Sequence, residues 1–206
     1  MIAIVDYGVG NLFSLRSSLG YCGAEGVVTS DPEIIRKSDK IILPGVGAFA
    51  DAAEKLKRTG LDRILTGQCA DGKPLLGICL GMQLLFEKSY EYGVHSGLGL
   101  IPGEIVPLKG YIPEGLKIPH MGWNSLSLRN PTPLYSGVSQ GEYVYFVHSY
   151  FAETDEKYVT AVTDYGAEIT ASVAHGNVLG TQFHPEKSGE SGLKILKAFC
   201  TGDFSC

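Results

Sequence analysis

Apolar and polar residues in the first half of the chain alternate between a period of two and a period of about 3.6, which predicts strands and helices in turn. Short apolar runs predict strands at Ile2–Val5, Val27–Thr29, Lys40–Leu43 and Lys73–Gly77. Helices are expected over residues 12–19, from the Asp31-Pro32 cap onward, and over residues 49–58 and 80–87. Repeated units of one strand and one helix predict a parallel sheet with helices on both faces.

The second half of the chain has a different pattern, in which short apolar runs are separated by Gly, Pro, Asn and Asp. Strands are expected at Ile105–Leu108, Trp123–Leu128, Glu142–Val147, Tyr158–Thr163, Glu168–Val173 and Val178–Gln182, and a last amphipathic helix at Leu193–Phe199. The two halves together predict an α/β fold: a flavodoxin-like open sheet, parallel or mixed, with an antiparallel extension in the second half. Since neither a repeat nor a linker divides the pattern, residues 1–206 are expected to form one domain.

The composition narrows the class of protein. Of 206 residues, 44% are hydrophobic and 19% are charged, which supplies a sizeable core and excludes a disordered chain. A net charge of −5 without a basic run argues against nucleic acid and membrane surfaces as partners. No apolar stretch reaches the roughly 18 residues of a membrane span, and the N-terminus has no cationic leader, so a cytoplasmic location is expected.

The chain has five cysteines, at positions 22, 69, 79, 200 and 206. Their odd number and irregular spacing indicate reduced thiols rather than a disulfide framework. No CxxC or HxxxH pattern is present, so the sequence predicts neither a metal site nor a cofactor.

One cysteine stands in a special setting, since Gly77-Ile-Cys79-Leu-Gly81 follows a predicted strand and precedes a predicted helix. A nucleophile between two glycines in this context is typical of a nucleophile elbow, where a sharp turn presents the side chain above the edge of the sheet. The start of the following helix favours a thiolate at Cys79. It also leaves the N–H of Leu80 available to a developing oxyanion. The alternative is that Cys79 is a small buried apolar residue.

A thiolate that transfers acyl groups needs a base that returns a proton to the leaving group. Among the five histidines, His184 stands immediately after a predicted strand, in His184-Pro-Glu186. Residues two apart in extended backbone point to the same side, so Glu186 can orient the imidazole. His120 and His148 lack a carboxylate two residues on, and a structural or partner-facing role is expected for both.

The turn Pro44-Gly-Val-Gly47 follows the third predicted strand, at the sheet edge where ligands of open α/β sheets bind. Its glycines allow the N–H of Val46 to point inward as a second oxyanion donor. A plain tight turn is the alternative for this segment.

The elbow Gly77-Ile-Cys79-Leu-Gly81-Met-Gln83, the Pro44–Gly47 turn and His184-Pro-Glu186 resemble, in order and separation, the class I (triad) glutamine amidotransferases. The resemblance covers essentially the whole chain. It implies that Cys79 is the nucleophile, His184 the general base and acid, and Glu186 the orienting carboxylate. It also implies an oxyanion hole from the N–H groups of Val46 and Leu80, and an L-glutamine site formed by Gly47, Gln83, Glu91, Ser149 and Tyr150.

Three further segments narrow the resemblance: Asp6–Asn11, Pro119–Asn124 and Phe146–Tyr150. They are similar to segments of family members that supply ammonia to a (β/α)₈ cyclase in histidine biosynthesis. That cyclase makes imidazole glycerol phosphate and an aminoimidazole carboxamide ribotide. The resemblance therefore implies a heterodimer with such a cyclase. The residues expected to face it are Asn11, Met121, Trp123, Asn124 and Lys187.

Three alternatives stay open on the sequence alone. Gly8-x-Gly10 after the first strand suggests a dinucleotide site, but Phe13 stands where the fingerprint needs its third glycine. A related cysteine hydrolase or chaperone would not require Gln83 and Glu91 to recognise an amino acid. A glutaminase of another pathway, such as pyridoxal phosphate biosynthesis, is disfavoured by the Pro119–Asn124 segment.

Overall fold

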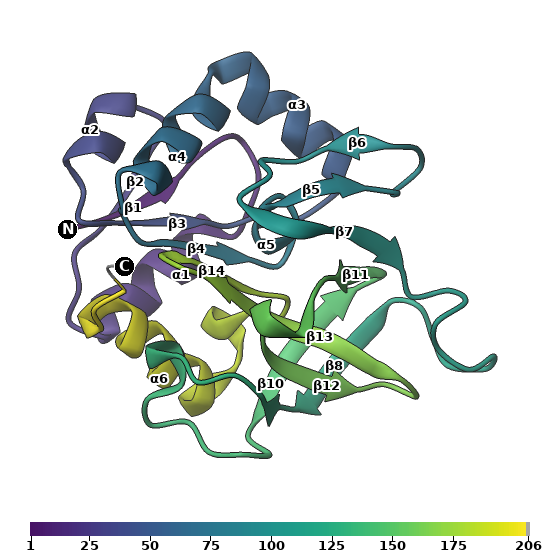
Figure 1. Cartoon of the computed structure of the whole chain (residues 1–206). Helices are drawn as coiled ribbons and strands as arrows, with labels where there is room; N and C mark the ends of the chain where they lie inside the picture. The colour runs from purple at the N-terminus through teal and green to yellow at the C-terminus, as the bar shows by residue number, and fades with distance from the viewer. Residues whose placement is uncertain (205–206) are drawn as a thin grey trace.

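The structure, a computed structural model, describes residues 1–204, and a central sheet of eight strands runs through it (Figure 1). In sheet order the strands are β2 (Gly26–Thr29), β1 (Ile2–Val5), β3 (Lys40–Leu43), β4 (Leu75–Ile78), β14 (Val178–Thr181), β13 (Glu168–His175), β12 (Val159–Asp164) and β9 (Ser127–Leu128). The first five strands are parallel, and the last three extend the sheet in antiparallel pairs. The parallel part has the doubly wound order of flavodoxin-like folds, which confirms the predicted fold class.

Side chains of the parallel strands point alternately into two apolar cores, one on each face of the sheet. In β1, Ala3 and Val5 belong to one core and Ile2 and Ile4 to the other. The first core is covered by α2 (Pro32–Lys37), α3 (Phe49–Thr59) and α4 (Leu61–Ala70), and the second by α1 (Leu12–Tyr21) and α6 (Gly189–Thr201) (Figure 1). Helices therefore cover both faces, as predicted.

The helix α4 was absent from the predicted elements. It begins directly after α3, because Gly60 adopts φ 72° and both ends one helix and precedes the next. Leu61, Leu65 and Cys69 recur at helical spacing and are buried. This helical spacing of apolar residues is the signal in the sequence from which α4 could have been predicted.

Two smaller sheets lie beside the central one. The first contains β11 (Tyr150–Glu153), β7 (Ile101–Pro107), β5 (Phe86–Ser89) and β6 (His95–Ser96), and the second pairs β10 (Tyr143–His148) with β8 (His120–Ser125). The remaining elements are α5 (Leu80–Gln83) and the 3₁₀ turns η1 (Pro133–Tyr135), η2 (Glu156–Tyr158) and η3 (Pro185–Lys187).

The helix predicted over residues 80–87 was wrong in its length. It ends at Gln83, and Phe86 begins β5. The backbone carbonyls of Leu84 and Leu85 accept hydrogen bonds from the N–H groups of Leu98 and Leu100, at 2.8 Å each. Pairing with a distant segment thus overrides a local helical pattern.

The C-terminal end of α6 is anchored to β3 by one lysine. Lys40 Nζ donates to the backbone carbonyls of Phe199, Cys200 and Gly202, at 2.7, 3.1 and 2.6 Å. The last carbonyls of a helix lack partners within the helix, and a cation there also interacts favourably with the helix dipole. Within residues 1–204, no helix is long and apolar enough to cross a membrane.

Candidate active site

Cys79 stands at the carboxyl end of β4, where the chain turns sharply into α5. Its backbone has φ 54° and ψ −112°, a conformation that residues with a Cβ rarely adopt. Two hydrogen bonds hold the turn: Cys79 N–H donates to the Thr181 carbonyl at 2.7 Å, and the Cys79 carbonyl accepts from Gln83 N–H at 3.1 Å. The predicted elbow is therefore present, with its strain carried by the cysteine itself.

The two glycines of the elbow are required by close packing of backbone on backbone. A Cβ at Gly81 would lie 1.8 Å from the Leu43 carbonyl oxygen, and one at Gly77 would lie 2.7 Å from the Gly81 carbonyl oxygen. Real Cβ atoms essentially never come this close to another non-bonded atom. Only glycine lets α5 begin this close to the ends of β3 and β4.

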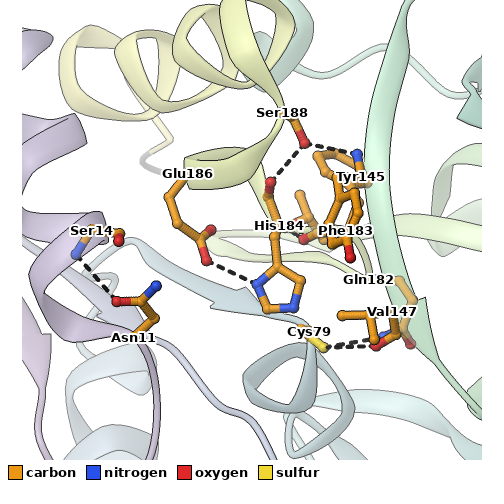
Figure 2. Close-up of polar contacts among 11 residues, drawn as sticks. Asn11, Ser14, Cys79, Tyr145, Val147, Gln182, Phe183, His184, Glu186 and Ser188 are labelled. Carbon is orange, nitrogen blue, oxygen red and sulfur yellow. Dashed lines mark hydrogen bonds and ion pairs between the residues drawn. The ribbon is translucent and has the colours of Figure 1, made fainter. Parts of the chain in front are cut away.

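His184 and Glu186 follow β14, the strand beside β4, so they reach the same edge of the sheet as Cys79. Figure 2 shows the imidazole between the carboxylate and the sulfur. His184 Nδ1 lies 2.8 Å from Glu186 Oε1, and the two side chains are only 2% and 4% exposed. His184 Nε2 points to the Cys79 side and has no hydrogen-bond partner among the described residues.

The position of His184 is fixed by backbone hydrogen bonds. Its N–H donates to the Tyr145 carbonyl at 2.9 Å, and its own carbonyl accepts from Ser188 Oγ at 2.6 Å. Ser188 Oγ also accepts from Tyr145 N–H at 2.9 Å (Figure 2). Hydrogen bonds with strand β10 and with the start of α6 thus fix the backbone of His184. Ser188 was not predicted, and nothing in the local pattern singled it out.

Three influences set the charge of His184. Burial lowers the pKa of the imidazole, whereas the neighbouring Cys79 and then Glu186 raise it, and the net result is about 9. The raised pKa favours an imidazolium at neutral pH. A positive charge beside a cysteine favours the nucleophilic thiolate over the thiol.

The Cys79 sulfur has two further neighbours, both 3.8 Å away. Gln182 Nε2 donates toward Sγ, and Sγ faces the Val147 carbonyl oxygen (Figure 2). Sequence reasoning missed Gln182, although the rule that placed Glu186 beside His184 also places Gln182 two residues before it. Its amide is held in place, because Gln182 Oε1 accepts from Gln83 Nε2 at 3.0 Å.

A cavity of about 390 Å³ opens beside the sulfur. Its wall includes Cys79, His184 and all seven residues predicted to stabilise the oxyanion or hold glutamine, which are Val46, Gly47, Leu80, Gln83, Glu91, Ser149 and Tyr150. The Glu91 carboxylate is fixed at the start of α3, since its Oε2 accepts from Phe49 N–H at 2.5 Å. The cavity therefore has a nucleophile at one place on its wall and a fixed negative charge at another.

Two candidate oxyanion donors lie on the same wall. Leu80 is the first residue of α5, and the first N–H of a helix has no partner within the helix. Val46 is 41% exposed and precedes Gly47, whose φ is 98°. The turn that carries Val46 is attached to the fold by Tyr7 Oη, which donates to the Pro44 carbonyl at 2.8 Å. Burial raises the pKa of Tyr7, so the phenol stays a donor.

The family described as "Glutamine amidotransferase class-I" matches residues 3–202. The chain belongs to this family. A protein of Bacillus cereus (strain G9842) named "Imidazole glycerol phosphate synthase subunit HisH" is 56% identical over 199 residues, which are 97% of this chain and 93% of that protein. A protein of the same name from Caldanaerobacter subterraneus subsp. tengcongensis is 52% identical over 97% of each chain.

Solved structures show the same fold at low identity. The chain matches a crystal structure of a glutamine amidotransferase with a TM-score of 0.74, at 18% identity, over 97% of this chain and 100% of that one. It matches PurLQS from Thermotoga maritima with a TM-score of 0.74, at 23% identity, over 96% and 95% of the two chains. Family membership decides against the dinucleotide-binding module and the cysteine hydrolase or chaperone as alternatives.

The five residues predicted to face a partner lie near the site but differ in exposure. Met121 and Trp123 are 61% and 55% exposed, Asn11 and Lys187 are exposed, and Asn124 is half-buried. Asn11 caps α1 through a hydrogen bond from Ser14 N–H at 3.4 Å (Figure 2). No partner chain tests these five residues, so their role stays a prediction.

The other cysteines lie away from the site. Cys22, Cys69 and Cys200 are free thiols, and burial raises the pKa of each. Cys206 lies outside the described residues. Among residues 1–204, no cluster of His, Cys, Asp and Glu could hold a metal ion.

Proposed function

We propose that this chain hydrolyses the side-chain amide of L-glutamine and passes the ammonia to a cyclase, as the glutaminase subunit of an imidazole glycerol phosphate synthase. Its family and the two relatives named HisH that are described above support the reaction and the pathway. The observation that carries the chemistry is the strained Cys79 facing the buried His184–Glu186 pair on the wall of one cavity.

In the first half of the reaction the Cys79 thiolate attacks the amide carbon of glutamine, and the carbonyl oxygen becomes an oxyanion. The N–H groups of Leu80 and Val46 stabilise this charge, which is greater in the transition state than in the bound substrate. The His184 imidazolium gives its proton to the amide nitrogen, so that ammonia leaves and a glutamyl thioester remains. Glu186 holds the imidazole in position and stabilises its charge.

In the second half a water molecule attacks the thioester. His184, now neutral, takes a proton from the water, and a second oxyanion forms at the same place. Collapse of this intermediate breaks the carbon–sulfur bond and releases glutamate. The thiolate and the imidazolium are then restored, so the cycle needs no cofactor.

Recognition of glutamine rests on the cavity wall. Glu91 provides a negative charge for the α-ammonium group, and the backbone at Gly47, Ser149 and Tyr150 provides polar groups for the rest of the amino acid. The Gln83 amide is oriented by its bond to the Tyr150 carbonyl at 3.0 Å. A fixed amide selects a substrate that carries complementary polar groups.

The partner in this proposal is a (β/α)₈ cyclase bound as a heterodimer in the cytoplasm, where a reducing environment keeps the thiol free. Ammonia released into neutral water is mostly protonated and is then a poor nucleophile. An acceptor enzyme that is docked to this chain can receive the ammonia before it is protonated in solution. The exposed Met121 and Trp123 lie on β8, on the same side of the strand, and form the centre of the proposed contact.

The test is glutamate release from glutamine by the chain alone and together with a matching cyclase and its ribotide ligand. We expect little release alone, a large increase in the complex, and none from Cys79→Ala, whose fold should be intact. High activity that the cyclase does not change would overturn the partner but not the reaction. No activity under either condition, with wild-type protein folded, would overturn the glutaminase assignment.

A further inference from the structure

Two buried histidines outside the Cys79–His184–Glu186 group form a hydrogen-bonded pair beside the cavity. His120 Nδ1 lies 3.0 Å from His148 Nε2, and the residues are 3% and 6% exposed. They stand opposite each other across the β8–β10 pair. His120 is stacked between the rings of Phe146 and Tyr165, with centroids 4.8 and 4.0 Å away. Burial, the hydrogen bond and the stacked rings together restrict the orientation of the imidazoles.

The partners of the pair determine which nitrogens carry protons. His148 Nδ1 lies 2.9 Å from the Tyr150 carbonyl oxygen, which only accepts, so Nδ1 donates. In a neutral imidazole Nε2 then accepts, and His120 Nδ1 is its donor. His120 Nε2 accepts in turn from Asn124 Nδ2 at 3.4 Å. Every ring nitrogen of the pair therefore has a partner of the correct kind when both rings are neutral.

Burial keeps the pair neutral. It lowers the pKa of His120 to about 4 and that of His148 to about 3. For the pKa of His148, the hydrogen bond to the Tyr150 carbonyl opposes burial, and the nearby charges of His120 and then His184 act with it, so that about 3 is the net result. Neither ring is thus suited to take up a proton during glutamine hydrolysis, and their contribution has to be geometric.

The His120–His148 pair lies against the backbone at the point where the chain leaves β10. At Ser149 the chain passes from the two-stranded sheet into β11 of the four-stranded sheet. The Ser149 carbonyl accepts from Leu108 N–H at 2.9 Å, whereas the Tyr150 carbonyl accepts from two side chains, His148 Nδ1 and Gln83 Nε2. Side chains thus hold the backbone at the crossing between the sheets.

We propose that His148, supported by His120, is a positioning residue of the glutamine site, which holds the Ser149–Tyr150 backbone in the conformation that receives the substrate. This inference rests on the proposed glutaminase function. Asn124, which donates to His120 at the other end of the pair, is itself held in place, since its Nδ2 also donates to the Asp164 carbonyl at 2.7 Å and its Oδ1 accepts from Ser125 N–H at 2.8 Å.

The test compares three variants in the complex with the cyclase. His148→Leu removes the bond to Tyr150 and should raise the KM for glutamine about tenfold, with a smaller change in kcat, because the part-buried Tyr150 carbonyl loses one of its donors. His148→Asn places an amide donor where Nδ1 stood and should restore most of the wild-type KM. His175→Asn is the matched control, since His175 Nδ1 also bonds a carbonyl, that of Leu100 at 3.0 Å, away from the cavity.

Alkylation of Cys79 by iodoacetamide adds a measurement that does not depend on glutamine binding. Its rate should be unchanged in His148→Leu, because the thiolate and His184 are intact. A wild-type KM in His148→Leu, or a slower alkylation of Cys79 in that variant, would overturn the proposal. If the wild-type complex hydrolyses no glutamine, the glutaminase function itself fails, and the inference fails with it.

Discussion

The substitution Gly81→Ala tests whether close packing at the elbow controls both stability and catalysis. The added Cβ would lie 1.8 Å from the Leu43 carbonyl oxygen, a backbone atom, and its own position is fixed by the backbone of Gly81. An ordinary contact needs about 3.4 Å, so α5 or the end of β3 must move by more than an ångström. Leu80, with its candidate oxyanion donor, moves with α5.

The expected cost follows from this displacement. Overpacking a well-packed site costs about 1–3 kcal/mol and occasionally more, and a clash between two backbones places Gly81→Ala at or above 3 kcal/mol. A misplacement of about 1 Å in an active site can cost 10²-fold in rate, so kcat/KM for glutamine should fall by at least about that factor. Urea unfolding gives the first quantity, and glutamate release in the cyclase complex gives the second.

Gly67→Ala is the matched control. Gly67 lies inside α4, and nothing lies within 4 Å of an added Cβ. Alanine there should increase the free energy of unfolding by about 0.5–1 kcal/mol and leave turnover unchanged. If Gly81→Ala unfolds at the same urea concentration as wild type and keeps full turnover, the packing argument is refuted.

Three further outcomes are expected. Glu186→Gln should lower kcat by roughly 10²–10⁴-fold and less than His184→Ala does, because it disturbs orientation rather than proton transfer; steady-state kinetics of both variants decide this. The His184 pKa of about 9 lies above the ordinary 6.5, so the imidazolium is lost as pH rises through 9. Turnover should fall there in a pH–rate profile, and a profile flat to pH 10 would contradict the ion pair. Lys40→Met removes three hydrogen bonds at about 1 kcal/mol each, partly offset by apolar contact, and should lower Tm by about 4–8 °C in a thermal melt. The exposed Lys57→Met should leave Tm unchanged.

Local patterns were enough to predict the parallel half of the fold and the positions of the reactive residues. Strands β1 and β3 are short apolar runs that are buried on both faces, which is the pattern of a parallel sheet. Cys79 and His184 each follow such a strand, and β4 and β14 are neighbours in the sheet. Knowing which residues follow the parallel strands was therefore enough to predict most of the residues of the site.

The remaining elements depend on contacts between segments far apart in the chain. Strand β5 exists because Phe86 and its neighbours pair with β7, and no local signal separates this run from a continued α5. Ser188 matters because its hydroxyl lies within hydrogen-bond distance of both His184 and the distant Tyr145. The His120–His148 bond requires two strands to meet in register, which composition and spacing do not specify.

Strand β14 lies between β4 and β13 in the central sheet. Gln182, which follows β14 and contacts the cysteine sulfur, is 103 positions away from it in the chain. During synthesis Cys79 therefore leaves the ribosome long before its base and its orienting carboxylate do. Until β14 inserts, β4 is an exposed edge strand and the thiol has no imidazole beside it. The reactive group is therefore complete only after β14 has joined the sheet, and a chain truncated before His184 should release no ammonia.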